Sequence, residues 1–230
     1  MLKENYDQVA EKVAAACKRA GRNPEEVTII AVSKTKPLSN VEELAQYGVM
    51  DFGENKVQEL CGKFEEISKP VRWHLIGHLQ TNKVKYIVDK VELIHSVDSL
   101  KLAKQISKEA VKSDVTVPVL IQVNVADEDT KFGTQTEEAM ELVLEAAKLP
   151  NIQIKGLMTI APFVADPEEN RVHFKQLKDL FVDIKEKNID NVIMEILSMG
   201  MTNDYEVAVE EGSTMVRVGT GIFGERNYNK

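Results

Sequence analysis

The chain alternates between short apolar runs and longer segments in which apolar residues recur at helical spacing. This alternation is typical of parallel strands joined by crossover helices. The apolar runs predict eight strands: Val27–Ser33, Val49–Phe52, Trp73–Ile76, Leu93–Val97, Val117–Val123, Ile154–Ile160, Ile193–Met199 and Met215–Gly219. The intervening segments predict helices at roughly 41–47, 55–67, 81–90, 100–112, 134–149, 167–187 and 204–211.

The series of repeats favours closure of the strands into a barrel. An open doubly wound sheet is the alternative, but eight repeats run on without a glycine- or proline-rich linker, which favours a (β/α)8 or TIM barrel. An extra helix over Asn5–Ala20 precedes the first strand and is ended by Gly21. The sequence therefore predicts an α/β protein in which one barrel domain spans residues 1–230.

Two of the predicted helices begin with recognisable capping residues. Thr134 followed by Glu137 has the spacing of a capping box, in which the two residues satisfy free backbone N–H groups. Asp166 stands directly before Pro167, which suits a cap residue ahead of a proline at the first helical position. Both signals predict where the helix starts.

Composition excludes several classes of protein. Of the 230 residues, 43% are hydrophobic and 29% are charged, which is ordinary for a globular chain. The formal net charge of -8 argues against nucleic-acid binding, which needs a basic surface. Cys17 and Cys61 are too few for a disulfide framework, and neither a signal peptide nor a membrane-spanning window is visible. We expect a cytoplasmic protein that binds neither nucleic acid nor membrane.

Polar residues gather where the predicted strands end. In (β/α)8 barrels the functional groups lie at the carboxyl ends of the strands. Those ends supply a polar, glycine-rich set: Lys34, Lys36, Gly53, Glu54, Asn55, Gly77, His78, His95, Asp98, Asn124, Met158, Thr159, Ser198, Gly200, Arg217, Gly219 and Thr220. The strand interiors are apolar by contrast, so the candidate site is at this end of the barrel.

Lys34 ends the first strand and is a candidate nucleophile. At a reference pKa of about 10.4, roughly one lysine in 2,500 is neutral at pH 7, and burial or a nearby cation raises that fraction. Such an amine forms a Schiff base with an aldehyde, and pyridoxal phosphate is the common partner. The ordinary alternative is a lysine that reaches solvent. Lys36 has the same strand parity, although Pro37 makes it the better loop residue.

Two glycine turns follow the seventh and eighth strands. Glycine lets the backbone approach a ligand closely, and helix starts offer N–H groups to an anion. Phosphate sites in such barrels are often built from these two loops. A phosphate cradle is therefore predicted from Ser198, Gly200, Met201, Gly219 and Thr220, with plain helix-entry turns as the alternative reading.

Arg217 lies two residues before Gly219 and shares its parity. If both face the barrel mouth, the buried guanidinium needs a partner. A ring nitrogen is one candidate. A cation at that position keeps a pyridine nitrogen unprotonated, which weakens the ring as an electron sink.

Several motifs carry a family resemblance. They are "AVSKTKP", "FGENKVQE", "WHLIGHLQTNK", "HSVDS", "GLMTI" and "LSMGMTNDYEVAVEEGSTMVRVGTGIFGERNY". From about residue 5 onward the chain resembles the pyridoxal phosphate homeostasis protein family, also called the YggS or PROSC family. That family is similar to the N-terminal barrel domain of alanine racemase, which has the fold-type III arrangement.

The resemblance implies a role for each matching residue. Pyridoxal 5'-phosphate (PLP) is the expected cofactor and no metal is expected. Lys34 is the implied Schiff-base lysine, and the other implied cofactor-binding residues are Asn55, His78, Ser198, Gly200, Met201, Arg217, Gly219 and Thr220. Lys56 departs from the family pattern, because its position is often aromatic in relatives.

The implied function is vitamin B6 homeostasis, in which the protein holds PLP and buffers or delivers it, without efficient catalysis. A PLP-dependent amino-acid racemase of low activity and a Schiff-base aldolase acting on a sugar phosphate are the alternatives. Racemisation needs an acid/base on each face of the substrate carbon, and alanine racemase takes one of these from a second domain. The sequence ends at Lys230, so we expect that domain to be absent, the protein to be a monomer, and PLP-dependent apo-enzymes to be candidate recipients.

Overall fold

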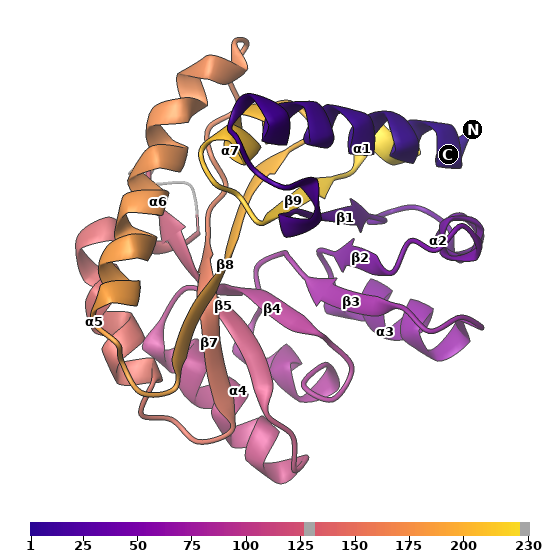
Figure 1. Ribbon diagram of the computed structural model, residues 1–230. Coiled ribbons are helices and arrows are strands. Elements are labelled where there is room, and N and C mark those ends of the chain that lie inside the picture. Colours follow the sequence, from indigo (N-terminus) through magenta and orange to yellow (C-terminus); the bar gives the residue numbers. More distant parts are fainter. Residues whose placement is uncertain (127–131, 226–230) are drawn as a thin grey trace.

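The computed structural model describes residues 1–126 and 132–225. In this part of the chain eight parallel strands form a closed barrel (Figure 1). Around the barrel they follow the order β4-β3-β2-β1-β9-β8-β7-β5, and the pairing of β4 with β5 closes the ring. The strands are β1 Thr28–Val32, β2 Asp51–Glu54, β3 Arg72–Leu75, β4 Leu93–Val97, β5 Val117–Asn124, β7 Ile152–Met158, β8 Val192–Met201 and β9 Met215–Val218. The predicted (β/α)8 barrel is confirmed.

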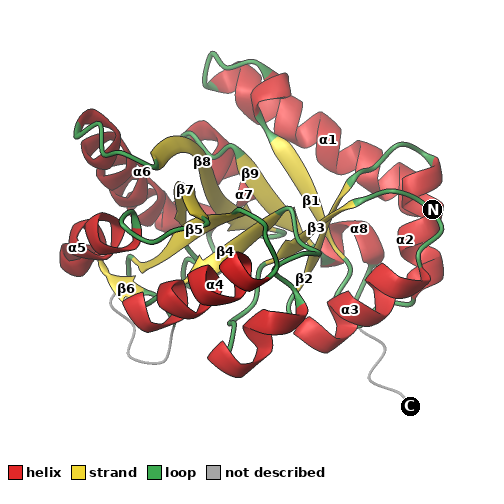
Figure 2. Ribbon diagram, turned by 90° about the horizontal axis from the view of Figure 1, so that it is seen from below, coloured by secondary structure: helices red, strands yellow, loops and turns green. Residues whose placement is uncertain are grey.

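Helices surround the strands on the outside (Figure 2). They are α1 Leu2–Arg19, α2 Leu38–Gln46, α3 Val57–Glu66, α4 Leu100–Lys112, α5 Thr136–Ala146, α6 Arg171–Glu186, α7 Tyr205–Glu210 and α8 Thr220–Phe223, with 3-10 helices η1 Pro24–Glu26, η2 Thr81–Tyr86 and η3 Pro167–Asn170. The extra helix α1 packs on α7 and α8 through its buried stripe, which includes Val9 and Val13. No helix in the described ranges is long and apolar enough to cross a membrane.

Two sequence predictions about helices differ from the structure. The segment expected as a helix over 81–90 is the 3-10 helix η2, because buried Val84, Ile87 and Val88 are spaced by three and four and fit either helix type. The capping box at Thr134 is wrong. Thr134 pairs with Val123 in the short strand β6 (Thr134–Gln135), so α5 starts later and Gln135 gives it no side-chain cap.

The predicted cap at Asp166 is confirmed. Its side chain accepts a hydrogen bond from the backbone N–H of Glu168 at 3.0 Å, with Pro167 in the first turn. The helix it starts is the 3-10 turn η3, which continues into α6.

The barrel strands bury different side chains on their two faces. Outward-facing residues such as Phe52 and Trp73 join one large apolar core beneath the helices. Inward-facing residues line what we call the lumen, and Ile30 and Val32 represent β1 there. The lumen also holds polar side chains, described below. Lys34 follows β1 by two residues, in the turn at the carboxyl end of the strand.

Candidate functional site

Lys34 lies just beyond the end of β1, and its side chain is half-buried. The neighbouring strand is β9, in which Arg217 stands opposite Ile30. Gly219 is adjacent to Val32, since a Cβ added to it would lie 3.6 Å from Val32 Cβ. Lys34 thus follows β1, and Arg217 and the second glycine turn belong to and follow β9, the strand paired with β1.

The backbone before Lys34 is held by buried polar contacts. The Ser33 hydroxyl donates to Glu54 Oε1 at 2.7 Å, and Lys63 Nζ donates to the Ser33 carbonyl oxygen at 2.8 Å. Lys63 Nζ also lies 2.5 Å from Glu54 Oε1. Burial raises the pKa of Glu54, while the hydrogen bonds from Lys63 and Ser33 oppose that shift. The sequence analysis assigned no role to Lys63.

The backbone after Lys34 is strained. Thr35 has a φ of 63°, in the left-handed region that β-branched residues rarely adopt. Its N–H donates to Glu59 Oε2 of α3 at 2.9 Å. Strain of this kind persists where surrounding structure holds it, and it clusters at functional sites. Lys34 is therefore fixed from both sides by contacts to β2 and α3.

Lys36 has a different environment. Its Nζ donates to the carbonyl oxygens of Phe223, Gly224 and Glu225 at 2.9, 3.1 and 3.0 Å. These are the carbonyl groups left without helical partners at the end of α8. Lys36 therefore fastens the end of α8 to the β1–α2 loop, which distinguishes it from Lys34 where strand parity could not.

Arg217 is buried in the lumen, with 4% of its surface exposed. Nη1 donates to Ser198 Oγ at 2.5 Å and Nη2 donates to the carbonyl oxygen of Thr159 at 2.7 Å. Burial lowers the pKa of Arg217 to about 10, and Asp204 opposes that shift. At neutral pH the guanidinium is a cation, and among the described residues it forms no ion pair.

A row of polar side chains continues below Arg217. Ser198 Oγ lies 2.9 Å from His95 Nδ1, His95 Nε2 lies 3.0 Å from His74 Nδ1, and His74 Nε2 lies 3.0 Å from Asp51 Oδ1. Arg72 Nε donates to the same Asp51 oxygen at 2.8 Å. His95 lies inside the barrel, so its placement at the strand end in the sequence analysis is wrong.

The first glycine turn, after β8, is shaped by close packing. Gly200 has a φ of 93°, and a Cβ there would lie 2.6 Å from Ala208 Cβ. The N–H of Met201 donates to Asp204 Oδ1 at 2.7 Å. The structure therefore directs the Met201 amide toward a carboxylate of the same turn, and a phosphate contact from this residue stays a prediction.

The second glycine turn is joined to the first by Thr202. Its Oγ1 accepts from the N–H groups of Gly219 and Gly221 at 3.3 and 3.4 Å. Thr220 begins α8 between these two amides. The sequence analysis missed Thr202, although a hydroxyl residue directly after "SMGM" was a usable signal. Its own O–H remains a donor that an anion at the turns could accept.

Asn55 and His78 follow neighbouring strands. Gly77 permits the close approach of their loops, since a Cβ on Gly77 would lie 2.3 Å from the Asn55 carbonyl oxygen. His78 Nδ1 is 3.4 Å from Asp98 Oδ2, and its ring stacks on Phe132 with centroids 3.8 Å apart. Both predicted residues therefore lie at the carboxyl end, on the β2 and β3 side of the mouth.

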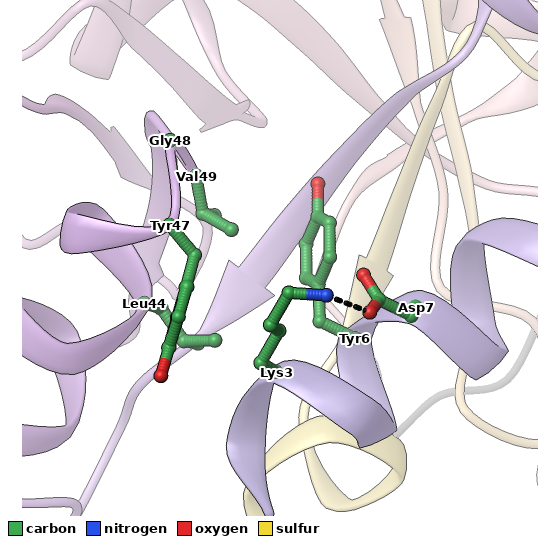
Figure 3. Close-up of a pocket in the computed structure, with 7 residues that line it drawn as sticks. All are labelled: Lys3, Tyr6, Asp7, Leu44, Tyr47, Gly48 and Val49. Atoms are coloured by element: carbon green, nitrogen blue, oxygen red, sulfur yellow. Dashed lines mark hydrogen bonds and ion pairs between the residues drawn. The ribbon is translucent and has the colours of Figure 1, made fainter.

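A separate pocket lies between α1 and the end of α2 (Figure 3). It measures about 220 Å³, below the ~300 Å³ at which ligand pockets usually begin. It is lined by Lys3, Tyr6, Asp7, Leu44, Tyr47, Gly48 and Val49. These residues belong to α1, to the end of α2 and to the segment that leads from α2 into β2. The pocket is therefore distinct from the strand-end site.

Residues 5–227 match the family model described as alanine racemase, N-terminal domain. A protein of Aquifex aeolicus (strain VF5), named pyridoxal phosphate homeostasis protein, is 44% identical over 226 residues, which cover 98% of each chain. The chain belongs to the pyridoxal phosphate homeostasis protein family. The family membership predicted from the sequence motifs is thereby confirmed.

Solved structures agree with the family assignment. PipY of Synechococcus elongatus PCC7942, solved with PLP bound, has a TM-score of 0.81 and 33% identity, covering 94% of this chain and all of PipY. Alanine racemase of Clostridium difficile 630 has a TM-score of 0.74 at 17% identity, and the match covers 99% of this chain and 57% of the racemase. That second likeness concerns the fold alone.

Proposed function

We propose that this member of the pyridoxal phosphate homeostasis protein family binds PLP at the carboxyl end of its barrel, holds it through Lys34, and buffers or delivers it in vitamin B6 homeostasis. The names of its relatives and the PLP bound to PipY support this proposal. The observation that carries it is the pairing of a rigidly held lysine with a buried arginine on adjacent strands, two residues below a glycine turn.

The groups at the site fit the three functional parts of the cofactor. When bound, PLP supplies an aldehyde carbon that reacts with an amine. Lys34 would supply that amine. The N–H of Thr220 at the start of α8 and the Thr202 hydroxyl supply donors for a phosphate. Arg217 supplies a cation for the ring nitrogen.

Arg217 also favours holding the cofactor over transforming a substrate. A guanidinium beside the ring nitrogen disfavours a proton there, because two cations would repel each other. The ring then withdraws electrons less strongly. Binding without rapid turnover suits a protein that must keep PLP and later give it up.

The racemase alternative needs a second acid/base, and the described tyrosines offer no ready one. Tyr6 and Tyr47 line the separate pocket between α1 and α2, and Tyr86 is exposed on η2. Burial raises the pKa of Tyr205 to about 12, far from an operating pH near 7. Tyr228 lies outside the described residues.

The cellular location, the oligomeric state and the recipients of the cofactor are part of the same proposal. Cys17 and Cys61 are both free thiols, which suits the cytoplasm, where thiols stay reduced. We place the protein there as a monomer, with PLP-dependent apo-enzymes as recipients of the cofactor. Size-exclusion chromatography with light scattering tests the monomer, and transfer of PLP to an apo-enzyme tests delivery.

A PLP titration followed by visible absorbance tests the binding itself. We expect a yellow complex for the natural protein and for Lys36→Ala, and none for Lys34→Ala. Absence of the complex from the natural protein would contradict the proposal. Rapid interconversion of D- and L-amino acids by the complex would establish the racemase instead, and a substrate adduct on a lysine without PLP would establish the sugar-phosphate aldolase.

A further inference from the structure

The polar side chains in the lumen form one continuous row from Arg217 to Asp51. Each contact joins groups on different strands: Ser198 on β8, His95 on β4, His74 on β3 and Asp51 on β2. We propose that this row is a hydrogen-bond chain with a single direction, and that Ser198, His95, His74 and Asp51 are positioning residues that fix the orientation of Arg217. The inference rests on the proposed function, because Arg217 is assigned there to the cofactor ring.

The lower end of the chain sets its direction. Asp51 bonds to Arg72 and His74, and it is a carboxylate at neutral pH, because these bonds outweigh its burial and hold the pKa of Asp51 at about 2. A carboxylate can only accept, so His74 carries its proton on Nε2 and donates it to Asp51. A neutral His74 ring then accepts at Nδ1, whereas a charged ring would donate from both nitrogens, and the NMR test below distinguishes the two. Tyr6 is the other titratable group whose charge interacts with Asp51.

The same reasoning continues upward. His95 is fully buried, and burial, His74 and Arg217 all lower its pKa, so its ring is neutral. Because His74 Nδ1 is an acceptor, His95 must donate from Nε2. Its own Nδ1 is consequently an acceptor and takes the proton of the Ser198 hydroxyl.

The upper end agrees with this direction independently. A guanidinium only donates, so Ser198 must accept from Arg217 Nη1 through an oxygen lone pair. In the reversed arrangement Ser198 would accept from both His95 and Arg217, and its own proton would have no partner within the row. The carboxylate at one end and the guanidinium at the other therefore specify the same arrangement, and every nitrogen in the row has one defined role.

This arrangement gives Arg217 a fixed orientation. A serine hydroxyl rotates freely unless its proton is held in a hydrogen bond. Here the Ser198 proton is held by His95 Nδ1. With Nη1 directed to Ser198 and Nη2 directed to Thr159, the guanidinium plane is set from two strands, β8 and the end of β7. A row that merely filled the lumen would need no particular direction of its protons, and this difference makes the proposal testable.

Nitrogen-15 NMR of the histidine rings in the ligand-free protein is the first test. The chain has four histidines, and His78 and His173 lie outside the row and serve as internal references. We expect His74 and His95 at pH 7 to be neutral and protonated on Nε2. A charged ring, or a proton on Nδ1, in either residue would overturn the proposal. This measurement needs no cofactor, so its outcome is independent of the proposed function.

Ser198→Ala is the second test, with His173→Gln as the matched control. Removing the hydroxyl should weaken PLP affinity by at least about tenfold, since a buried hydrogen bond to a charged group is lost. It should also shift the absorbance spectrum of bound PLP, because Arg217 is no longer held against the ring. The control should change neither property.

The outcomes separate the two proposals. If the natural protein binds no PLP, the proposed function fails. If it binds PLP and Ser198→Ala leaves both affinity and spectrum unchanged, the positioning role fails while the function stands. Should Ser198→Ala not fold, the histidine protonation pattern of the natural protein decides the question.

Discussion

The ammonium group of Lys36 lies 2.9 Å from the carbonyl oxygen of Phe223, which is 187 residues away in the sequence. This contact joins the loop after the first barrel strand to the end of the last helix. Lys34, two residues earlier, is half-buried in the turn just beyond the end of β1. Lys36 of the "SKTKP" motif therefore holds the fold together, and Lys34 is the lysine that we propose for the Schiff base.

Replacing Lys36 with alanine should lower stability without abolishing PLP binding. The change removes charge-assisted hydrogen bonds to three carbonyl groups, and we expect a loss of about 1–3 kcal/mol in the free energy of unfolding. Urea denaturation measures it. Lys56→Ala is the control, since Lys56 is exposed and gives α3 no side-chain cap. A Lys36→Ala protein of unchanged stability would contradict this role.

Thr35→Gly should raise the free energy of unfolding by about 1 kcal/mol. Glycine adopts the left-handed conformation at φ 63° without the steric cost that a β-branched residue incurs. Thr35→Ala keeps a Cβ and should recover much less of this energy. Thermal and urea denaturation compare the three proteins. If Thr35→Gly is the least stable of them, the backbone at Thr35 is not strained.

Gly77→Ala should be strongly destabilising, by about 2 kcal/mol or more. The new Cβ would lie 2.3 Å from the Asn55 carbonyl oxygen, so one of the two loops must move. Gly62→Ala provides the matched control, because nothing lies within 4 Å of its Cβ position in α3. There alanine should stabilise the protein by about 0.5–1 kcal/mol. Equal effects of the two substitutions would contradict the close approach of the loops.

Asp51 should account for part of the loss of folding stability at acidic pH. Its pKa is lowered from 3.8 to about 2, so the carboxylate stabilises the fold above pH 4 and this contribution disappears as the pH falls toward 2. The shift corresponds to about 2 kcal/mol. In Asp51→Asn the free energy of unfolding should fall less steeply between pH 4 and 2. Identical slopes for the two proteins would show that Asp51 is not the group responsible.

The sequence was informative wherever a feature depends on near neighbours along the chain. Strand alternation placed Arg217 on the lumen side, and glycine turns marked the loops after the last two strands. The cap at Asp166 was readable because cap and helix start are adjacent. The 3-10 helix that begins at Thr81 could not be predicted, because an apolar spacing of three and four residues fits both an α-helix and a 3-10 helix.

Side-chain contacts across the barrel could not be predicted from the sequence. His95 meets Ser198, 103 residues away, only because β4 and β8 both face the lumen of a closed ring. Which inward residues meet depends on the stagger of the strands, and parity alone does not specify it. For the same reason the sequence suggested no partner for Lys36, and it missed the bridging position of Thr202.

Reduction of the PLP complex with borohydride, followed by mass spectrometry of its peptides, tests the central claim most directly. Borohydride makes the bond between the lysine and the cofactor permanent, so the modified residue can be identified. We predict a single adduct on the peptide that contains Lys34, located on Lys34 itself. An adduct on Lys36 or another lysine, or the absence of any adduct, would contradict the account.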